Sequence, residues 1–420
     1  MTGGPTRRAR SYRALLAVAA LALGACGRDA VAARTTSAPP DATHWVTTWA
    51  TSPQADDPED AKKIHGQTLR QVVRVSLGGG RIQVRFSNAF GTQPLAIGSA
   101  HVALHEKGSA IVAASDRAMT FAGTTAVKIA PGAFTVTDPV AVDVAPLAEL
   151  AVSVFLPEDV VTTTVHGTAQ ATTYWSRAGD FTGAPVLEEA TTTTSWYNLG
   201  CVEVQAASAA GTIVALGDSL TDGMKSTVDA HHSWPEFLAD RLNARRDAPP
   251  RAVVNAGISG NRVLDELVGP SALARLDRDV LGVPGVSYVV FEEGANDLAT
   301  HAPKPDSTPE ELIAGLRQVI ERTHARGLGI AGGTIPPFEG ATFGLKFTPT
   351  TEAARQAVNA WIRTGGAYDA VLDFDRVLRD PSHPTRILPA YDSGDHAHPN
   401  DAGYKAMADA IDTAIFAPRR

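Results

Sequence analysis

The sequence predicts an all-β part followed by an α/β part, and three observations support this prediction. From about His44 to Gln205, apolar residues alternate with period two and no segment has a convincing helical period. After about residue 208, apolar runs alternate with amphipathic helical segments, which is typical of a parallel sheet covered on both faces. The 420 residues are also too many for one ordinary core. We therefore predict a jelly-roll-like β-sandwich domain over residues 44–207 and an α/β domain over residues 208–420.

The first 43 residues are predicted to be a signal and a tether. Four arginines precede the apolar run ALLAVAALALGA, which is typical of a secretory signal and is too short to span a bilayer. We expect residues 1–25 to be a signal peptide, residues 26–43 to be a flexible tether, and the mature chain to be secreted to the cell envelope or beyond. The stretch LGAC, which ends at Cys26, resembles a bacterial lipoprotein box. Acylation of Cys26 is therefore expected, with a plain signal peptide cut somewhat later as the alternative.

Composition excludes several classes of partner and site. The formal charge falls from −8 to −12 when the four arginines of residues 1–25 are removed, which argues against nucleic acid as a partner. The chain has two cysteines, Cys26 and Cys201, so neither a disulfide framework nor a cysteine metal site can be built. We expect no cofactor and no metal. Membrane attachment is expected only through an acylated Cys26.

The strands of the β-rich part are marked by alternation and by glycine-rich breaks. RIQVRFS places Ile82, Val84 and Phe86 on one face. Residues 78–80 are three glycines that separate this run from LRQVVRVS, so the two runs predict a hairpin. The threonine-rich residues 191–195 are expected to form an exposed strand edge or a loop. Further strands are expected at AHVALHE, AVKIA, AVDVA, LAVSVFLP and TTYWSR.

The α/β part reads as five strands with helices between them. Strands are expected at TIVALG, AVVNAG, SYVVFEEG, LGIAGGTI and AVLDF. Helices are expected over residues 233–244, 271–281, 309–325, 352–364 and 402–416. Ser307 or Thr308, followed by Pro309 and two glutamates, is a good helix start. His231 and His232 are expected to lie in a solvated loop.

Ser219 is the first candidate for chemistry. It follows the strand TIVALG, and ligands of parallel sheets bind outside the carboxyl ends of the strands. Gly217 and Asp218 suit a tight turn at this point. The same residues would also suit an ordinary strand-to-helix turn in which Ser219 is the N-cap.

A segment near the C-terminus, Asp395-His396-Ala397-His398, holds what a serine nucleophile needs. A serine requires a base within hydrogen-bond reach, and a histidine base requires a carboxylate on its other nitrogen. Asp395 and His398 are three residues apart, so one turn of chain can bring them together, whereas Asp395 and His396 are adjacent and would point apart. We predict His398 as the base and Asp395 as the acid that orients it. His396 as the base, and a metal site that uses Asp395 and both histidines, are the alternatives.

Two further loops could stabilise a tetrahedral oxyanion, which requires preorganised N–H donors. NAGISGNRV follows the second strand and contains Gly260, and GANDL follows the third strand and contains Asn296. The backbone amides of Ser219 and Gly260 and the side-chain amide of Asn296 could supply three donors. Each loop alone has an ordinary interpretation, because loops after strands are rich in these residues, but the joint order favours an acyl-transfer site.

The set GDSLTDG, GISGN, GAND and DHAHP resembles the SGNH/GDSL hydrolases over about residues 211–418. The resemblance implies an esterase with a flavodoxin-like three-layer fold. It assigns Ser219 as nucleophile and oxyanion donor, Gly260 and Asn296 as the rest of the oxyanion hole, His398 as base and Asp395 as its orienting acid. The whole mature chain also resembles a bacterial two-domain subgroup in which a β-rich domain precedes the hydrolase domain.

These inferences predict a secreted serine esterase that hydrolyses short-chain carboxylic esters through an acyl-enzyme and deacetylates a carbohydrate. A lipase or arylesterase is the alternative within enzymes, and a binding or adhesion protein with an inactive hydrolase domain is the alternative of another class. Activity should require neutral His398 and fall below about pH 6.

Three neighbouring charged residues carry structural expectations. Asp222 is expected to tie the turn after Ser219, and Glu293 is expected to be a structural carboxylate bonded to loop amides. Arg262 is expected either to face the substrate or to form a salt bridge with one of the acids.

Overall fold

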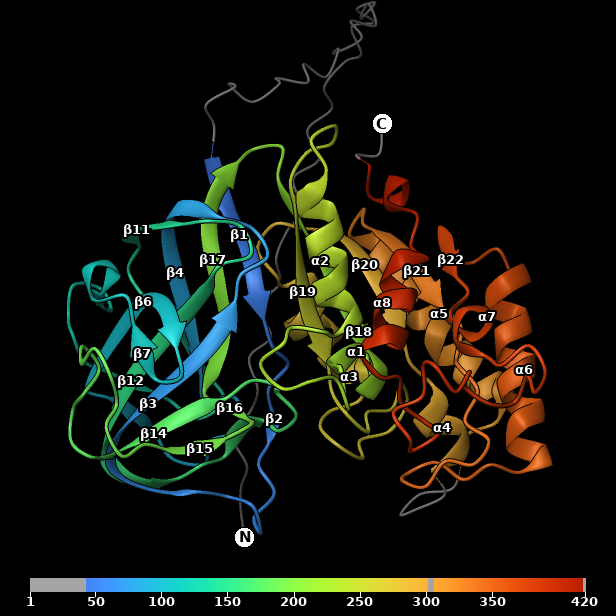
Figure 1. Ribbon diagram of the computed structural model, residues 1–420, viewed down its shortest axis with the longest axis horizontal. Helices are drawn as coiled ribbons and strands as arrows, with labels where there is room; N and C mark the ends of the chain where they lie inside the picture. The colour runs from blue at the N-terminus through green and yellow to red at the C-terminus, as the bar shows by residue number, and fades with distance from the viewer. Residues whose placement is uncertain (1–42, 301–305, 418–420) are drawn as a thin grey trace, which may run out of the picture. The chain divides into compact units, whose positions relative to one another are not determined.

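The computed structural model describes residues 43–300 and 306–417. The predicted signal peptide, Cys26 and the tether lie outside these residues. The β-rich part contains two larger antiparallel sheets (Figure 1). The first contains β1 (Thr43–Ala50), β17 (Leu199–Ala207), β4 (Gly79–Ser87) and β10 (Phe134–Val136), with β11 (Val140–Val144) beside β4. The second contains β15 (Thr191–Thr193), β14 (Thr173–Ala178), β3 (Lys63–Arg74), β12 (Glu149–Val161), β6 (Ser99–Lys107) and β7 (Ala110–Ile111), with β8 (Arg117–Met119) beside β6.

The β-rich part also contains several smaller elements. A three-stranded sheet contains β16 (Trp196–Tyr197), β13 (Thr164–His166) and β2 (Gln54–Ala55). Strands β5 (Leu95–Ile97) and β9 (Val127–Ile129) form a pair, and residues Ala113–Ser115 form a short 3-10 helix. Of these, β13 bears on the chemistry described below.

The two larger sheets share one core. Ile82, Val84 and Phe86 of β4 are fully buried, as their alternation predicts. They belong to the same apolar cluster as Leu69 of β3 and Val152 of β12, which lie in the second sheet. The β-rich character of this part agrees with the prediction, while the jelly-roll description stays a prediction.

The predicted hairpin between β3 and β4 is wrong, because the two strands lie in different sheets. Strand β3 pairs with β12 on one edge and with β14 on the other, so it has no free edge for β4. Strand β4 instead pairs with β17, which in turn pairs along its length with β1. Gly78 therefore lies where the chain crosses from one sheet to the other, and Gly79 and Gly80 begin β4.

The α/β part contains one parallel sheet of five strands. Its order is β19 (Arg251–Gly257), β18 (Gly211–Gly217), β20 (Val286–Glu292), β21 (Gly329–Gly333) and β22 (Ala370–Leu372). The change from antiparallel to parallel sheets falls between β17 and β18, next to the predicted domain boundary at residue 208. The five predicted strands thus all form, and the flavodoxin-like description stays a prediction.

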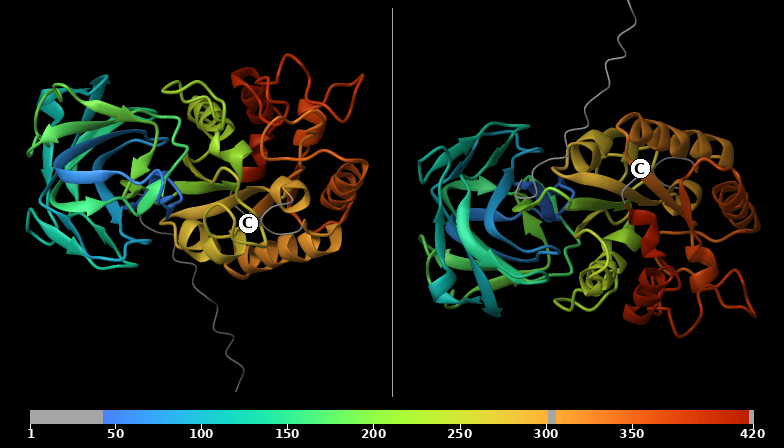
Figure 2. Two further views of the ribbon diagram at one scale, coloured as in Figure 1. Left: turned by 90° about the horizontal axis from the view of Figure 1, so that it is seen from below. Right: turned by 90° about the horizontal axis from the view of Figure 1, so that it is seen from above.

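Helices pack on both faces of the parallel sheet (Figure 2). Val214 and Leu216 of β18 belong to the cluster with α3 (Ala272–Leu276), α5 (Pro309–Ala325) and α6 (Pro349–Thr364). Ile213 and Ala215 belong to the cluster with α2 (Trp234–Ala244), α7 (Phe374–Leu378) and α8 (Asp401–Asp409). None of the helices in the described part of the chain combines the length and apolar character that crossing a bilayer requires.

Helix ends follow the capping residues. Helix α5 has the predicted bounds, because Thr308 caps it and Pro309 occupies its first turn. Helix α6 begins three residues before the predicted start at residue 352, because Thr348 accepts a hydrogen bond from the backbone N–H of Thr351. Two predicted helices are divided: Asp277–Leu281 after α3 is a π-helix, and Thr413–Phe416 after α8 is a 3-10 helix. The short helices α1 (Ser219–Asp222) and α4 (Ala295–Ala299) were not predicted.

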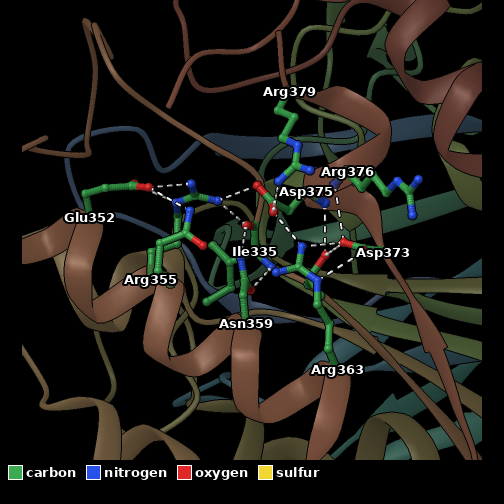
Figure 3. Close-up of polar contacts among 11 residues, drawn as sticks. Ile335, Glu352, Arg355, Asn359, Arg363, Asp373, Asp375, Arg376 and Arg379 are labelled. Atoms are coloured by element: carbon green, nitrogen blue, oxygen red, sulfur yellow. Dashed lines mark hydrogen bonds and ion pairs between the residues drawn. The ribbon is translucent and has the colours of Figure 1, made fainter. Parts of the chain in front are cut away.

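A buried carboxylate joins helices α6 and α7 (Figure 3). Asp375 is fully buried. Its Oδ1 accepts a hydrogen bond from Arg355 Nη1 at 2.7 Å, and its Oδ2 accepts one from Arg363 Nη2 at 2.5 Å. Arg379 Nη1 lies 3.5 Å from the same Oδ2. Because Asp375 is the shared acceptor of three cations, its charge is well compensated only while the two helices stay together.

The same cluster holds the segment that follows β21. Ile335 donates its backbone N–H to Asn359 Oδ1 at 2.8 Å, and its carbonyl accepts hydrogen bonds from Asn359 Nδ2 at 2.8 Å and from Arg355 Nη1 at 2.9 Å. Figure 3 shows these side chains converging on Ile335 from α6. The next residues, Pro336 and Phe338, line the cavity described below. The buried ion cluster therefore supports one wall of that cavity.

Hydrogen bonds connect the β-rich part with the α/β part. Thr47 of β1 donates its N–H to the carbonyl of Pro284 at 3.0 Å and accepts a hydrogen bond from Thr212 Oγ1 at 2.8 Å. Arg74 Nη2 donates to Asp240 of α2 at 2.6 Å. The described residues belong to a single compact unit, so these contacts lie within one body.

His231 is a further link between the two parts, and the prediction that it lies in a solvated loop is wrong. Its side chain is only 15% exposed. Its Nε2 donates to Glu149 of β12 at 2.5 Å, and its Nδ1 donates to Glu236 of α2 at 3.0 Å. Burial alone would lower the pKa of His231, but the hydrogen bonds with these two glutamates raise it to about 9.

This link predicts a loss of stability in mild alkali. Because the pKa of His231 is raised on folding, its contribution is complete below about pH 6.5 and is lost as the pH rises through 9. We expect the free energy of unfolding to fall by up to about 3 kcal/mol over this interval. Urea unfolding at about pH 6.5 and at about pH 9 measures this change in the free energy of unfolding. The fall should be clearly smaller in His231→Gln than in His65→Gln, a variant at an exposed histidine; equal falls in both variants would contradict the assignment.

Candidate active site

The parallel sheet brings three of the predicted residues to one edge. Its register pairs Gly217 at the end of β18 with Gly257 of β19 and with Glu292 of β20, so the three strands end level. The loops that follow therefore leave the sheet at the same edge, as expected for the carboxyl ends of parallel strands. These loops carry Ser219, Gly260 and Asn296.

The turn into α1 explains the residues around Ser219. A Cβ atom on Gly217 would lie 2.2 Å from Thr221 Oγ1 and 2.3 Å from the carbonyl oxygen of Glu292, so the turn requires glycine there. Asp218 is the N-cap of α1 and accepts a hydrogen bond from the N–H of Leu220 at 3.1 Å. The alternative in which Ser219 is the N-cap is wrong, because Asp218 takes that place. The hydroxyl of Ser219 is thus free for another partner.

That partner is His398, which comes from the loop before α8. Its Nε2 lies 2.9 Å from Ser219 Oγ, and its Nδ1 lies 2.7 Å from Asp395 Oδ2. A carboxylate accepts hydrogen bonds, so Nδ1 carries the proton and Nε2 is left to accept the proton of the serine hydroxyl. The structure thus brings together the three residues that the sequence indicated, from segments 179 positions apart.

Asp395 is held in its ionised form. Burial alone would raise its pKa, but hydrogen bonds from the His398 ring and from the backbone N–H groups of His398 and Ala397 hold the pKa well below its usual range. The two backbone bonds measure 2.9 and 3.0 Å. An ionised Asp395 fixes the tautomer of His398 and stabilises its positive form.

His396 takes no part in this arrangement. It has a left-handed backbone (φ 62°), and its Nδ1 is hydrogen-bonded to Asp392. Its side chain is half exposed. In residues 43–300 and 306–417, no group of three or more histidine, cysteine or acidic side chains has an arrangement suited to a metal ion.

Asn296 and Gly260 face the same cavity as Ser219 and His398. Asn296 Nδ2 donates to the carbonyl of Asn261 at 3.0 Å and lies 3.4 Å from Asp218 Oδ2. Gly260 has a left-handed backbone (φ 80°). One amide hydrogen of Asn296 is therefore held by a normal hydrogen bond, while the other has only a long contact.

Four acids are buried behind this edge, and burial is the main cause of their raised pKa values. Burial raises the pKa of Asp218 to about 7 and that of Asp297 to about 6, and it raises the pKa values of Glu292 and Glu293 well above the usual range. Arg275 Nη2, 3.8 Å from Glu293, offsets part of the effect there. Glu292 and Glu293 are thus held in the neutral form, which limits the negative charge behind the serine.

Two expectations about these charges need correction. The oxygens of Glu293 make no hydrogen bond within the described residues, so it is not bonded to loop amides. Asp297 has that role, because it accepts hydrogen bonds from the N–H groups of Val263 and Leu264 at 2.9 and 3.1 Å. Arg262 is fully buried, and among the described residues its guanidinium has no hydrogen-bond partner.

The cavity beside Ser219 has a volume of about 310 Å³ and mainly apolar walls. Phe338, Phe343 and Leu345 come from the segment after β21, and Val268 comes from the loop after Gly260. Phe343 is 67% exposed and Val268 is 37% exposed. Leu220, Met224 and Leu267 complete the apolar lining. The cavity therefore has room for an apolar group next to the serine.

Sequence reasoning missed a polar contact that reaches this edge from the β-rich part. Asp222 does not tie the turn after Ser219 through its side chain. Its Oδ1 instead accepts a hydrogen bond from His166 Nε2 at 2.9 Å, and its Oδ2 accepts two from Ser259, the residue before Gly260. A lone histidine in a strand of a different part gives no sequence signal for such a contact.

Comparison with known proteins gives a family for the α/β part. Residues 215–406 match the model of the GDSL-like lipase/acylhydrolase family. No curated protein sequence matches the chain. Among solved structures, a putative lipolytic protein of the G-D-S-L family from Desulfitobacterium hafniense is 23% identical, with a TM-score of 0.37 over 47% of this chain and 96% of its own. An acetylxylan esterase from Geobacillus stearothermophilus is 22% identical, with a TM-score of 0.37 over 50% of this chain and 97% of its own.

Proposed function

We propose an acyl-enzyme mechanism for this chain, which through residues 215–406 belongs to the GDSL-like lipase/acylhydrolase family and is an ester hydrolase. The observation that supports this mechanism is the hydrogen-bonded series Ser219–His398–Asp395, with distances of 2.9 and 2.7 Å. This is the arrangement that activates a serine for attack on an ester carbonyl. It also argues against a binding protein with an inactive hydrolase domain.

In the first step, Ser219 Oγ attacks the ester carbonyl and His398 Nε2 takes its proton. Asp395 stabilises the imidazolium that forms. His398 then gives the proton to the leaving alcohol, which departs and leaves an ester between the acyl group and Ser219. In the second step, His398 takes a proton from water, which attacks this ester, and then returns the proton to Ser219 Oγ as the bond to the acyl group breaks and the acid is released.

The negative oxygen formed in each step needs hydrogen-bond donors. We assign this role to the backbone N–H groups of Ser219 and Gly260 and to Asn296 Nδ2, which all belong to residues of one cavity. The 3.4 Å contact between Asn296 and Asp218 is long, so an oxyanion can replace it at little cost. The hydrogen bond to Asn261 at 3.0 Å meanwhile holds the amide group in place.

Two classes of ester are candidates for the substrate. Export and the β-rich part favour a short acyl group on a carbohydrate, as the sequence predicts. The apolar walls of the cavity favour an ester with a larger apolar acyl or aryl group. The cavity volume of about 310 Å³ is at the lower limit of typical ligand sites, so it suits a medium group and not a long fatty acid.

A series of p-nitrophenyl esters separates these candidates. We expect kcat/KM to rise from acetate to butyrate, by up to about fourfold for each buried CH2 group, and to fall for palmitate. Acetylated xylo-oligosaccharide should be hydrolysed more slowly than butyrate ester. A preference for acetate, together with rapid deacetylation of the oligosaccharide, would support the carbohydrate instead.

We further propose that the enzyme acts outside the cytoplasm, either attached to a membrane through an acylated Cys26 or released. The support is the N-terminal sequence alone, because residues 1–42 lie outside the described part.

A further inference from the structure

A histidine of the β-rich part contacts the helix that carries the nucleophile. His166 lies at the end of β13 and is 4% exposed, and Asp222 lies at the end of α1 and is 6% exposed. His166 Nε2 and Asp222 Oδ1 are 2.9 Å apart. On the other side of the ring, Nδ1 lies 3.0 Å from the carbonyl oxygen of Ser52. Both partners of this imidazole therefore belong to the interior of the protein.

The partners of His166 determine its protonation. A carbonyl oxygen and a carboxylate oxygen are both acceptors, so each ring nitrogen must donate a proton and the ring is an imidazolium. Trp196 stacks on the ring at 5.6 Å between centroids, which favours a cation. Burial alone would lower the pKa of His166, but Asp222 and the hydrogen bond to Ser52 raise it. His166 and Asp222 thus form a buried ion pair.

The second oxygen of Asp222 holds the loop that contains Gly260. Asp222 Oδ2 accepts a hydrogen bond from the Ser259 N–H at 2.8 Å and another from Ser259 Oγ at 2.7 Å. Ser259 directly precedes Gly260, and Asp222 lies one helical turn after Ser219. The backbone also fits tightly here, because a Cβ atom on Gly257 would lie 2.3 Å from the N–H nitrogen of Asp222. Asp222 therefore fixes the separation between the nucleophile and the Gly260 amide.

We propose that His166 is a positioning residue for ester hydrolysis: by fixing Asp222, and through it Ser259, it places the Gly260 amide where it can bind the oxyanion formed at Ser219. The inference rests on the proposed function. Without His166, Asp222 Oδ1 would be a buried oxygen with no donor, and the carboxylate would turn toward another partner and release Ser259. The β-rich part then has a direct effect on catalysis.

The test compares two variants of the full-length chain that each remove a histidine–aspartate contact from the β-rich part. His166→Leu removes the contact with Asp222. His101→Leu is the matched control, because His101 of β6 contacts Asp116 at 2.9 Å within the β-rich part. Turnover of p-nitrophenyl acetate is measured per active site, with sites counted by a fluorophosphonate. This count removes the effect of misfolded protein.

We expect kcat per active site to fall by about 10- to 100-fold in His166→Leu, with KM within about twofold of the wild type. His101→Leu should match the wild type. His166→Gln should recover much of the loss, because its amide can still donate to Asp222. A His166→Leu enzyme with unchanged kcat per active site would overturn the proposal, as would equal losses in the leucine and glutamine variants.

A second variant keeps the proposal testable if His166→Leu does not fold. Ser259→Ala removes one of the two hydrogen bonds to Asp222 and should lower kcat per active site by about threefold to tenfold. In the His166→Gln background, Ser259→Ala should change kcat per active site by a different factor than it does in the wild type, because both residues act through Asp222. If Ser259→Ala lowered kcat by the same factor in both backgrounds, the proposed action of His166 through Asp222 would be overturned.

Hydrogen exchange separates this inference from the proposed function. The amides of residues 257–261 should exchange faster in His166→Leu than in the wild type or His101→Leu, and unchanged exchange would overturn the positioning role. This result does not depend on activity. If the wild type failed to hydrolyse any ester, the proposed function would fail while the exchange measurement would still decide the role of His166.

Discussion

Replacing Ser219 with alanine is expected to lower kcat for ester hydrolysis by about 10⁶-fold, the size of effect seen when the nucleophile of a serine hydrolase is removed. The reason is geometric, because Ser219 Oγ is the atom that His398 Nε2 contacts at 2.9 Å. His398→Ala should cause a similar loss. The double variant should be no worse than either single variant, because the two residues act as one unit. Turnover of p-nitrophenyl acetate measures all three.

Ser226→Ala is a matched control for this experiment. Ser226 is a buried serine a short distance along the chain, and its hydroxyl has no hydrogen-bond partner among the described residues. We expect the wild-type rate for this variant. Equal rates for wild type and Ser219→Ala would exclude a serine esterase, and additive losses in the double variant would show that Ser219 and His398 act separately.

Replacing Asp375 with alanine is expected to destabilise the protein by about 3–5 kcal/mol. The change removes the common acceptor of Arg355 and Arg363 and leaves the fully buried Arg355 with only Glu352 as a charged partner. Urea unfolding measures the loss. Asp375→Asn should lie between the wild type and the alanine variant, because its side-chain oxygen can still accept one of the hydrogen bonds.

Asp409→Ala is the control for this change. Asp409 is half exposed and pairs with Lys405 at the surface of α8, so its loss should cost less than about 1 kcal/mol. If Asp375→Ala were no more destabilising than Asp409→Ala, the buried cluster in Figure 3 would not be a main support of α6 and α7.

The strands and long helices could be predicted because periodicity and capping are local properties. Thr308 and Pro309 mark the start of α5 in the sequence itself, and the apolar run of β18 ends at Gly217. Strand pairing depends on contacts distant in sequence, so the hairpin between β3 and β4 was predicted wrongly. Whether β3 has a free edge is decided by β12 and β14, which lie much later in the chain.

The residues of the candidate site also fall into two groups: those that short motifs indicate and those that depend on contacts between distant parts of the chain. Ser219, Asp395 and His398 could be indicated in advance because a nucleophile, a base and an acid are needed together, and each lies in a short, distinctive segment. The partners of Asp222 could not be predicted from the sequence, because His166 lies in an ordinary β-strand and Ser259 lies in an ordinary loop. His231 was misjudged because only the fold brings Glu149 to it.

The pairing of β1 with β17 has a consequence for how the chain folds during synthesis. Thr43 lies opposite Ala207 in this pair, and Thr47 also bonds to residue 284. Strand β1 therefore meets its sheet partner only when about half of the 420 residues have been made, and its contact with residue 284 only when about two-thirds have been made. Such distant contacts slow folding and leave β1 without its partners meanwhile, a condition in which incomplete chains are prone to aggregate.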